Sequence, residues 1–354
     1  MDFSLFYFAN EADPTGAGAA DRYKLLLDGA RFADERGFTA VWTPERHFHP
    51  FGGNYPNPSV LAAAVAAVTT RVAIRAGSVV APLHHPVRIA EEWAVVDQLS
   101  HGRAGVSFAS GWHPRDFALM PGNFADRKDK LLSIVEQVRE LWRGGEVAVV
   151  DGAGEQQHVR SYPRPVQPEL PVWITSSGGP ETFRQAGRVR AGVLTHLIGQ
   201  DLDQLAEKIA AYREEYAATG PTGDDRGHVV LMLHAYLHED EAAAKETVRE
   251  PLMDYLRGFA GLTMSASARG RGIDVSQLNP RHLDAMVERS FDRYFDEGGL
   301  LGTTEKAIGT VERVRKTDVD EIACLIDFGV PQDKVHAGLD LLDDLRTASV
   351  GDPR

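Results

Sequence analysis

The sequence predicts an α/β protein, a (β/α)8 barrel of the TIM type in one domain spanning residues 1–354. Three observations support this prediction. Eight short apolar runs are spaced along the chain, stretches with helical spacing of apolar residues separate them, and 354 residues exceed the roughly 250 that such a barrel needs. Strands that alternate with helices are expected to pair in parallel, because a crossover helix returns the chain to the same edge of the sheet.

The expected elements follow one another in a regular order. Pro86 opens one helix, since the first helical position needs no N–H, and Gly37 and Gly102 end two others. A doubly wound open sheet is the alternative, but no GxGxxG motif follows the first strand. We expect strands at residues 3–9, 38–42, 72–80, 104–109, 172–175, 193–197, 229–237 and 321–327.

Two stretches are predicted to be insertions into the barrel. Residues 144–171 are rich in Gly, Gln and Pro, which favours an excursion that could contain a hairpin. Residues 239–300 are helical and charged, with a Gly/Ser/Arg-rich break at residues 265–272. We interpret that break as a mobile lid or a disordered loop.

Composition limits the function classes. Lys plus Arg number 38 and Asp plus Glu 51, giving a net charge of −13, which argues against nucleic acid or an anionic membrane as the main partner. There is no signal-peptide pattern and no apolar stretch of about 18 residues, so we expect a cytoplasmic protein outside the membrane. The single Cys324 lies in an apolar run and is predicted to be a buried, inert thiol rather than a nucleophile.

The second strand is followed by a dense group of functional side chains. Glu45, Arg46, His47 and His49 offer an acid, a permanent cation and two titratable rings where barrel active sites lie. His47 is the candidate acid or base, because its ordinary pKa is nearest neutrality. The alternative is structural: a Glu45–Arg46 ion pair, with the histidines filling a turn.

A phosphate-binding site is predicted where the fifth strand meets a helix. Small residues there let backbone N–H groups converge at a helix amino terminus, which carries partial positive charge. Arg127, at the start of another helix, could add a full charge, although a solvated surface arginine is the alternative. Glycine-rich turns also occur for steric reasons alone. The predicted phosphate site comprises Ser176, Ser177, Gly178 and Gly179, and Thr175 just before it is a further candidate for cofactor binding.

Two further strand ends are candidates for contact with a ligand. Gly77 and Ser78 interrupt a buried strand, which suits either a flat ring system pressed against it or packing against a neighbouring helix. Ser110 and Gly111 follow the fourth strand and are another pair of small residues at a strand end that could contact a ligand.

A metal centre is a further alternative. His47 and His49 occupy alternate positions, like a strand-end pair of barrel metal hydrolases, and His196 and Asp327 near other strand ends would complete a ligand set. The pair follows the second strand rather than the first, so we expect no metal.

Three motifs occur in one order along the chain: Glu45-Arg46-His47-Phe48-x-x-Phe51-Gly52, Pro82-x-x-His85-Pro86-Val87-Arg88-x-Ala90-Glu91 and Asp97-Gln98-x-Ser100-x-Gly102-Arg103. This order resembles bacterial luciferase and its flavin-dependent monooxygenase relatives. The similarity is collinear to about residue 235. Within that family the chain resembles the atypical members associated with polyketide and nonribosomal-peptide assembly lines, through Thr175-Ser176-Ser177-Gly178, Pro180-Glu181-Thr182-Phe183 and Thr195-His196-Leu197.

The resemblance implies an FMN- and O2-dependent monooxygenase. Reduced FMN (FMNH2) would come from a separate flavin reductase, oxygen would add at the flavin C4a position, and the hydroperoxide would oxygenate an acyl or aminoacyl substrate of secondary metabolism, free or tethered to a carrier protein. It also implies a homodimer. A deazaflavin-dependent oxidoreductase of the same superfamily and a flavin-binding protein without catalysis are the alternatives.

The resemblance also assigns residues. The acid beside the flavin falls on Glu45, the non-proline cis peptide of the third strand on Gly77-Ser78, and the phosphate site on residues 176–179 with Arg127. There are two departures. Luciferase has His-His after the acid where this chain has Arg46, and a phosphate-binding arginine where this chain has Ser110, which predicts a loosely held flavin.

Overall fold

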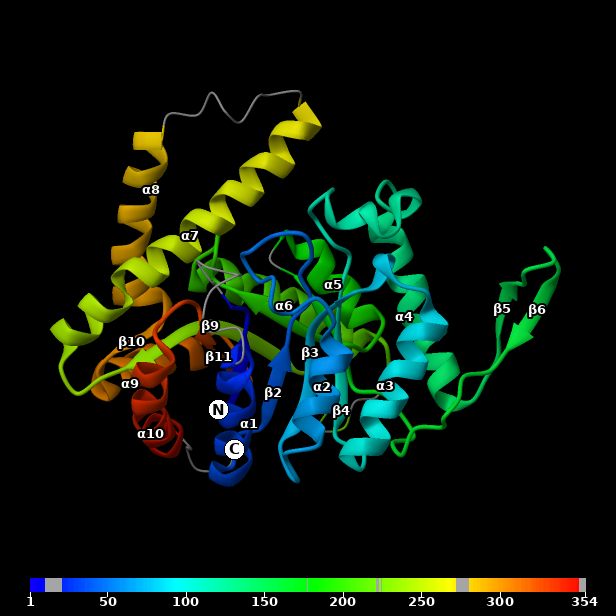
Figure 1. Cartoon of the computed structure of the whole chain (residues 1–354), viewed down its shortest axis with the longest axis horizontal. Helices are drawn as coiled ribbons and strands as arrows, with labels where there is room; N and C mark the ends of the chain where they lie inside the picture. Colours follow the sequence, from blue (N-terminus) through cyan, green and yellow to red (C-terminus); the bar gives the residue numbers. More distant parts are fainter. Residues whose placement is uncertain (10–20, 177, 221–222, 224, 272–279, 350–354) are drawn as a thin grey trace.

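The computed structural model describes residues 1–9, 21–176, 178–220, 223, 225–271 and 280–349, with the backbone alone for residues 264–271 and 280–286. Nine strands join in one sheet, and all of them except β10 form a closed parallel ring in the order β9-β11-β1-β2-β3-β4-β7-β8 (Figure 1). Pairing of β8 with β9 closes the ring. The predicted barrel is therefore confirmed, and the open sheet is wrong. The ring strands are β1 (Asp2–Tyr7), β2 (Ala40–Thr43), β3 (Ala73–Val80), β4 (Ala104–Ala109), β7 (Val172–Thr175), β8 (Gly192–His196), β9 (Val229–Leu237) and β11 (Glu321–Asp327).

Helices surround the ring and end where local chemistry requires it. The first helix stops at Gly37, whose φ of 80° is unfavourable for other residues. Asp201 and Gln204 form a reciprocal capping box at the start of α6. The helices are α1 (Lys24–Arg36), α2 (Pro58–Ala66), α3 (Pro86–Ser100), α4 (Arg127–Arg143), α5 (Pro180–Arg188), α6 (Leu202–Ala218), α7 (Glu241–Arg271), α8 (Pro280–Arg293), α9 (Thr304–Arg315) and α10 (Gln332–Ser349).

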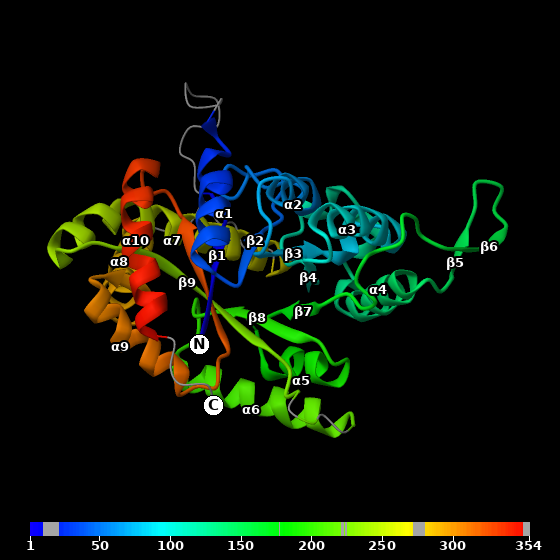
Figure 2. The same ribbon diagram turned by 90° about the horizontal axis from the view of Figure 1, so that it is seen from below.

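The two stretches predicted as insertions have different structures. Residues 144–171 include the antiparallel hairpin of β5 (Val147–Val150) and β6 (Gln156–Val159), which extends away from the barrel (Figure 2). The other stretch contains α7, α8 and the short strand β10 (Leu300–Gly302), which the sequence did not predict and which pairs with β9. The predicted break at residues 265–272 is wrong up to Arg271, because α7 continues to that residue, and Gly272 lies outside the described residues.

The amino-terminal end of the barrel is closed by a buried polar network. Glu321 of β11 is fully buried and accepts hydrogen bonds from Ser4 at 2.5 Å and from Nη1 of Arg75 at 2.8 Å. The Arg75 guanidinium lies between two indoles, 5.1 Å from the ring of Trp42 and 4.6 Å from that of Trp173. This end is filled by its own side chains, so a ligand site belongs at the opposite end.

Cys324 is buried, as predicted, and burial raises the pKa of its thiol well above its usual range. Among the described residues, no helix is both long and apolar enough to cross a bilayer.

Candidate functional site

The last residues of four neighbouring strands are partly exposed. Val80, Ala109, Thr175 and His196 end β3, β4, β7 and β8 and are half-buried, whereas the residue before each of them is buried. Because these strands are adjacent and parallel, their ends form one accessible surface at the barrel mouth. Residues that the sequence analysis selected lie on or next to this surface.

Glu45 is the centre of a buried hydrogen-bond cluster. Its Oε1 lies 2.8 Å from Nε2 of His47 and 2.6 Å from Nε2 of His84, and its Oε2 accepts the backbone N–H of Val80 at 2.6 Å. Burial raises the pKa of Glu45, but the hydrogen bonds from the two histidines and from Val80 outweigh it, so the pKa is lowered overall and the carboxylate is ionised. Both imidazoles therefore present Nε2–H to Glu45.

The cluster changes the electrostatics of His84. Burial lowers its pKa, but the hydrogen bond and the charge of Glu45 raise it above its usual value overall. His47 is mostly buried, with 12% of its side chain exposed. When neutral, it keeps a lone pair on Nδ1, because Nε2 carries the proton.

Arg46 pairs with an acid that the sequence analysis missed. Its Nη1 lies 2.6 Å from Oδ2 of Asp116, and its guanidinium carbon is 5.3 Å from the ring centre of Trp112. The pair is buried, yet Nε and Nη2 of Arg46 and Oδ1 of Asp116 have no hydrogen-bond partner. The predicted alternative, a Glu45–Arg46 ion pair, is wrong.

The third strand carries the expected cis peptide bond between Gly77 and Ser78. A Cβ at Gly77 would lie 2.6 Å from Cε2 of Phe6 and 3.1 Å from Cε3 of Trp42. The absence of a side chain is thus already required by packing inside the barrel, against β1 and β2 rather than against a helix. The Gly77 backbone is half-buried and keeps an accessible side.

Three hydroxyl groups from adjacent strands form a chain beside this position. Ser78 of β3 hydrogen-bonds Thr175 of β7, and Oγ of Ser107 in β4 lies 2.6 Å from Oγ1 of Thr175. The structure therefore brings Ser78 and Thr175 together, as separate predictions from distant parts of the chain implied.

The loop after β4 is tied to α4 by Arg127. Its Nε donates to the carbonyl of Gly111 at 3.2 Å and its Nη1 to that of Phe124 at 2.8 Å. No described residue accepts from its Nη2. Gly111 has a φ of 73°, and Ser110 donates only to the Gly111 carbonyl, at 3.5 Å. Arg127 is therefore more than a solvated surface arginine.

Among the described residues, no side chain caps the start of α5. Gly179 is its N-cap residue and supplies no side-chain cap, and a Cβ at Gly178 or Gly179 would meet open space. Ser176 is 6% exposed, and its Oγ has no hydrogen-bond partner. Ser177, the remaining predicted residue of this turn, lies outside the described residues.

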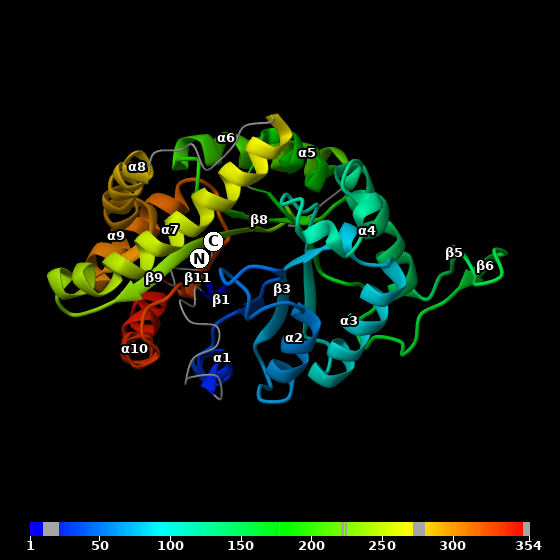
Figure 3. The same cartoon turned by 45° about the horizontal axis from the view of Figure 1, so that its top comes forward.

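Helix α7 lies against the loops at the mouth, and Figure 3 shows it passing in front of β8 and β9. Tyr255 contacts the rings of Phe8 and Phe51 at 5.6 and 4.8 Å, and Phe259 contacts Trp112 at 6.3 Å. Both α7 residues, like His84 and Asp116, were not predicted from the sequence. His84 could have been found, because it follows the end of a strand just as His47 does.

Two histidines lie beneath α7. His234 is 4.5 Å from the ring of Tyr255, and Phe259 is 6.2 Å from that of His196. Burial lowers the pKa of His234 to about 3, with a further contribution from His196. Among the described residues, no group of three or more His, Cys, Asp or Glu could hold a metal ion, so the residues of the hydrolase alternative are not assembled.

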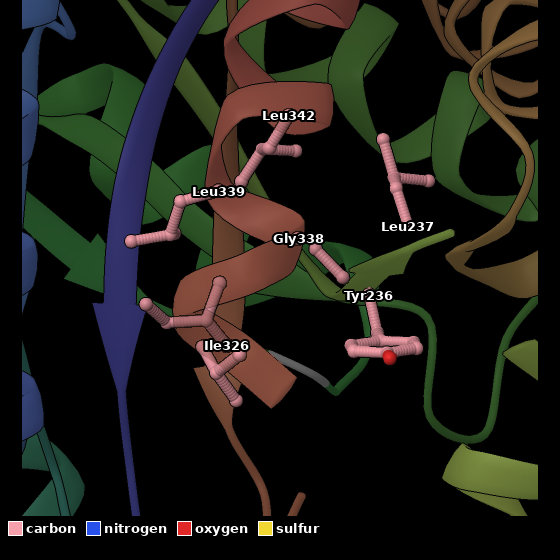
Figure 4. A pocket seen from close by; sticks show the side chains of 8 residues that line it. Tyr236, Leu237, Ile326, Gly338, Leu339 and Leu342 are labelled. Carbon is pink, nitrogen blue, oxygen red and sulfur yellow. The ribbon is translucent and has the colours of Figure 1, made fainter. Parts of the chain in front are cut away.

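A pocket on the outside of the barrel is not a ligand site. It lies between α10 and strands β9 and β11, with Tyr236, Ile326 and Leu339 among its lining residues (Figure 4). Its volume of about 10 Å³ is at the lower limit for one water molecule. It is a packing gap, and the chemistry stays at the mouth.

Known proteins similar to this chain include oxygenases and a dehydrogenase. The oxygenase component of the flavin-dependent trigonelline monooxygenase of Acinetobacter baylyi is 24% identical over 351 residues, covering 96% of this chain and 93% of the relative. The F420-dependent glucose-6-phosphate dehydrogenase of Amycolatopsis mediterranei is 29% identical over 253 residues, covering 69% and 72%.

Among solved structures, monooxygenase RslO1 from Streptomyces bottropensis shares the fold, with a TM-score of 0.81, 24% identity and coverage of 99% of this chain and 100% of that one. Residues 1–321 match the luciferase-like monooxygenase family. That match spans most of the sequence and runs through every strand end described above except that of β11. The chain therefore belongs to the luciferase-like monooxygenase family.

Proposed function

We propose that this chain is the oxygenase component of a two-component flavin-dependent monooxygenase. It takes reduced FMN from a separate flavin reductase and oxygenates an acyl or aminoacyl substrate of secondary metabolism, free or tethered to a carrier protein. The relative similar over nearly its full length is named an oxygenase component, which supports the division of labour. A single domain, a homodimer and a cytoplasmic location are parts of this proposal.

The single observation that carries the proposal is the unsatisfied turn before α5. In the part of the chain that the structure describes, the buried Ser176 hydroxyl has no partner and no side chain caps the helix amino terminus. A phosphate would satisfy both, since it accepts hydrogen bonds from hydroxyl and backbone N–H groups and is favoured by the helix dipole. These residues fit the phosphate of FMN, with Thr175, Gly178 and Gly179 completing the turn.

The neighbouring strand ends fit the rest of the flavin. Gly77 is partly exposed and precedes the buried Ser78, and Ser110 and Gly111 follow the neighbouring strand β4. Among the described residues, nothing accepts from Nη2 of Arg127, so this group is available to an anion. Reduced FMN with O2 supplies the oxidising power: one oxygen atom enters the substrate, the other leaves as water, and the flavin provides two electrons.

Residues of the chain itself handle protons and charge. The Nδ1 lone pair of His47 accepts a proton from the substrate, and the ionised Glu45 stabilises the imidazolium that results. The partnerless Nε and Nη2 groups of Arg46 donate to an oxygen atom that gains negative charge. Tyr255 and Phe259 of α7 exclude water from the mouth.

A deazaflavin-dependent oxidoreductase is the second candidate, because a relative covering about two thirds of the chain is an F420-dependent dehydrogenase. That cofactor also carries a phosphate, so the turn before α5 suits both. The two candidates differ in their use of oxygen.

The test is anaerobic equilibrium dialysis of the full chain with FMNH2 and, separately, with reduced F420. Oxygen is then added, and the appearance of oxidised FMN is followed by absorbance. We expect FMNH2 to bind and its oxidation to be slower than that of free FMNH2, because the closed mouth controls access. Binding of reduced F420 in preference to FMNH2 would establish the second candidate, and binding of neither would refute both.

A further inference from the structure

A cleft of about 510 Å³ lies at the outer rim of the mouth. The loop after β2 contributes His49, the loop after β4 contributes His113 and Arg115, and α7 contributes Arg257, Gly258 and Leu262. This volume is typical of sites for small organic molecules. The cleft is separate from the turn before α5, and no residue proposed above to hold the flavin lines it.

The charges around the cleft leave an excess of positive charge. Arg46 pairs with Asp116 at 2.6 Å and Arg257 with Asp254 at 2.7 Å, so those two guanidinium groups are balanced. Within the part of the chain that is described, Arg115 has no carboxylate at ion-pair distance, and no acidic residue lines the cleft. A local positive charge on a chain of net charge −13 would concentrate anions at this place.

His49 adds a neutral hydrogen-bond donor. Its Nδ1 accepts the backbone N–H of Phe51 at 3.0 Å, so the proton of the neutral ring is on Nε2, for which no described residue is an acceptor. Burial lowers the pKa of His49, and the charges of Arg46 and Arg115 lower it further. The ring therefore stays neutral at physiological pH, and both guanidinium groups lie close enough to act on it.

The inner wall of the cleft is apolar. A Cβ at Gly258 would lie 2.8 Å from Cδ2 of Phe51, so α7 sits directly against that ring at this point. Leu262 lines the cleft and is mostly buried, and Gly258 and Gly261 of α7 lie beside it. The cleft thus has donors and positive charge on one side and hydrocarbon on the other.

We propose that this cleft binds the carboxylate of a small organic acid and that this acid is the substrate of the oxygenase. The inference rests on the proposed function and narrows its substrate class. Arg115 receives the carboxylate, and His49 donates from Nε2. The hydrocarbon part packs against Gly258, Gly261 and Leu262 of α7. A free acid suits the cleft better than a carrier-bound thioester, which has no carboxylate at its acyl end.

The test is calorimetric titration of the full chain, without flavin, with benzoate, phenylacetate and hexanoate and with the matching neutral amides. We expect at least one acid to bind at least about tenfold more tightly than its amide, because the amide cannot form the charge-assisted hydrogen bond. Arg115→Gln should lower acid affinity by about tenfold and remove the preference. Arg143→Gln, which removes the same charge from the exposed end of α4, is the matched control and should leave the affinity unchanged.

Each outcome bears on the inference separately from the proposed function, because FMNH2 binding is measured on the same preparation. If FMNH2 binds but no acid is preferred over its amide, or Arg143→Gln acts like Arg115→Gln, the cleft proposal is wrong and the oxygenase proposal stands. If an acid is preferred but FMNH2 does not bind, the cleft is an acid-binding site, but the oxygenase proposal and the assignment of the acid as its substrate are both wrong. Phosphopantetheine binding in preference to every acid would assign the cleft to a carrier arm and overturn the free-acid proposal.

Discussion

At the scale of single residues, Glu45 joins the loops after β2 and β3. Its two oxygens accept from His47, His84 and the Val80 amide, and its side chain is fully buried. Both oxygens are thereby used within the protein. Glu45 therefore positions the imidazoles, and His47 is the member of the cluster that faces substrate in our proposal.

Replacing Glu45 by Gln should change the titration of His84. Glu45 is the main reason that the pKa of His84 is raised against the effect of burial, so E45Q should lower that pKa. NMR titration of the His84 ring measures the shift. Glu92 contributes only a weaker charge effect, and E92Q, the control, should lower the pKa by less. Equal shifts in the two variants would contradict the assignment of Glu45 as the partner.

The same pair makes stability depend on pH in two directions. Because the pKa of Glu45 is lowered by folding, the ionised side chain stabilises the fold at every pH above 4.5, the usual pKa of a glutamate. This stabilisation is lost as the pH falls through the lowered pKa. Because the pKa of His84 is raised by folding, the protonated imidazole stabilises the fold at every pH below 6.5, the usual pKa of a histidine. This stabilisation is lost as the pH rises through the raised pKa. E45Q should therefore lower the free energy of unfolding most, by about 1–3 kcal/mol, between pH 4.5 and pH 6.5. A loss in urea unfolding that did not vary with pH would refute this.

At the scale of elements, α5 is a helix whose start is built for something other than its own stability. Ser, Thr, Asp or Asn at the N-cap stabilises a helix by about 1 kcal/mol relative to Ala and by a few tenths relative to Gly, and this helix has Gly179 there. The backbone at Gly179 is extended, with φ of −72° and ψ of 169°, so any residue could adopt it. Glycine at this point thus leaves the N–H groups open, as a phosphate site requires.

Gly179→Asp should therefore raise stability and lower flavin affinity together. The carboxylate caps the helix, adding a few tenths of a kcal/mol to the free energy of unfolding, since glycine is itself a tolerated N-cap residue. It also repels and displaces the phosphate, which should weaken FMNH2 binding by about tenfold. Thermal unfolding and anaerobic dialysis measure the two effects. Gly179→Ala, which meets no neighbour and supplies no cap, should leave FMNH2 affinity nearly unchanged. If G179D bound FMNH2 as well as the native chain, the turn would not be the phosphate site.

At the scale of the whole molecule, the two ends of the barrel are specialised. At the amino-terminal end, Glu321 of β11 accepts hydrogen bonds from Arg75 of β3, Ser4 of β1 and Trp42 of β2. At the carboxyl-terminal end, buried groups such as Arg46 and Ser176 keep atoms without partners. One end satisfies its polar groups internally, and the other has capacity for a ligand.

Arg75→Met tests this division. It leaves Glu321 buried beside a hydrophobic side chain, which should cost about 3–5 kcal/mol in urea unfolding. FMNH2 binding below the unfolding transition should not change, because Arg75 lies at the far end. R75M/E321Q should recover part of the loss, since the unpaired charge is gone. Arg36→Gln, which breaks an exposed contact with Asp340, should cost at most about 1 kcal/mol. If R75M lowered the free energy of unfolding no more than Arg36→Gln does, the network around Glu321 would not be important for stability.

Periodicity and turn chemistry in the sequence were sufficient for the barrel. Apolar runs define the ring strands because a parallel strand buried on both faces must be apolar along its length. Pro86, Pro180 and Gly37 mark helix ends because their backbone restrictions act locally. β10 escaped prediction because its three residues are too short for a pattern. The predicted break in α7 failed because Gly and Ser lower helix propensity only weakly, and packing can outweigh them.

By itself, the sequence determined which functional groups are carried to the mouth, since every residue that follows a strand of a parallel barrel arrives at the same end. It could not determine which of these groups meet. Glu45 is next to Arg46 in sequence but pairs with His84, and Arg46 pairs with Asp116, 70 positions away. Those pairings depend on the spacing of strands around the ring and on rotamers chosen during packing. Only the tertiary structure contains that information, because pairs so distant along the chain leave no local pattern.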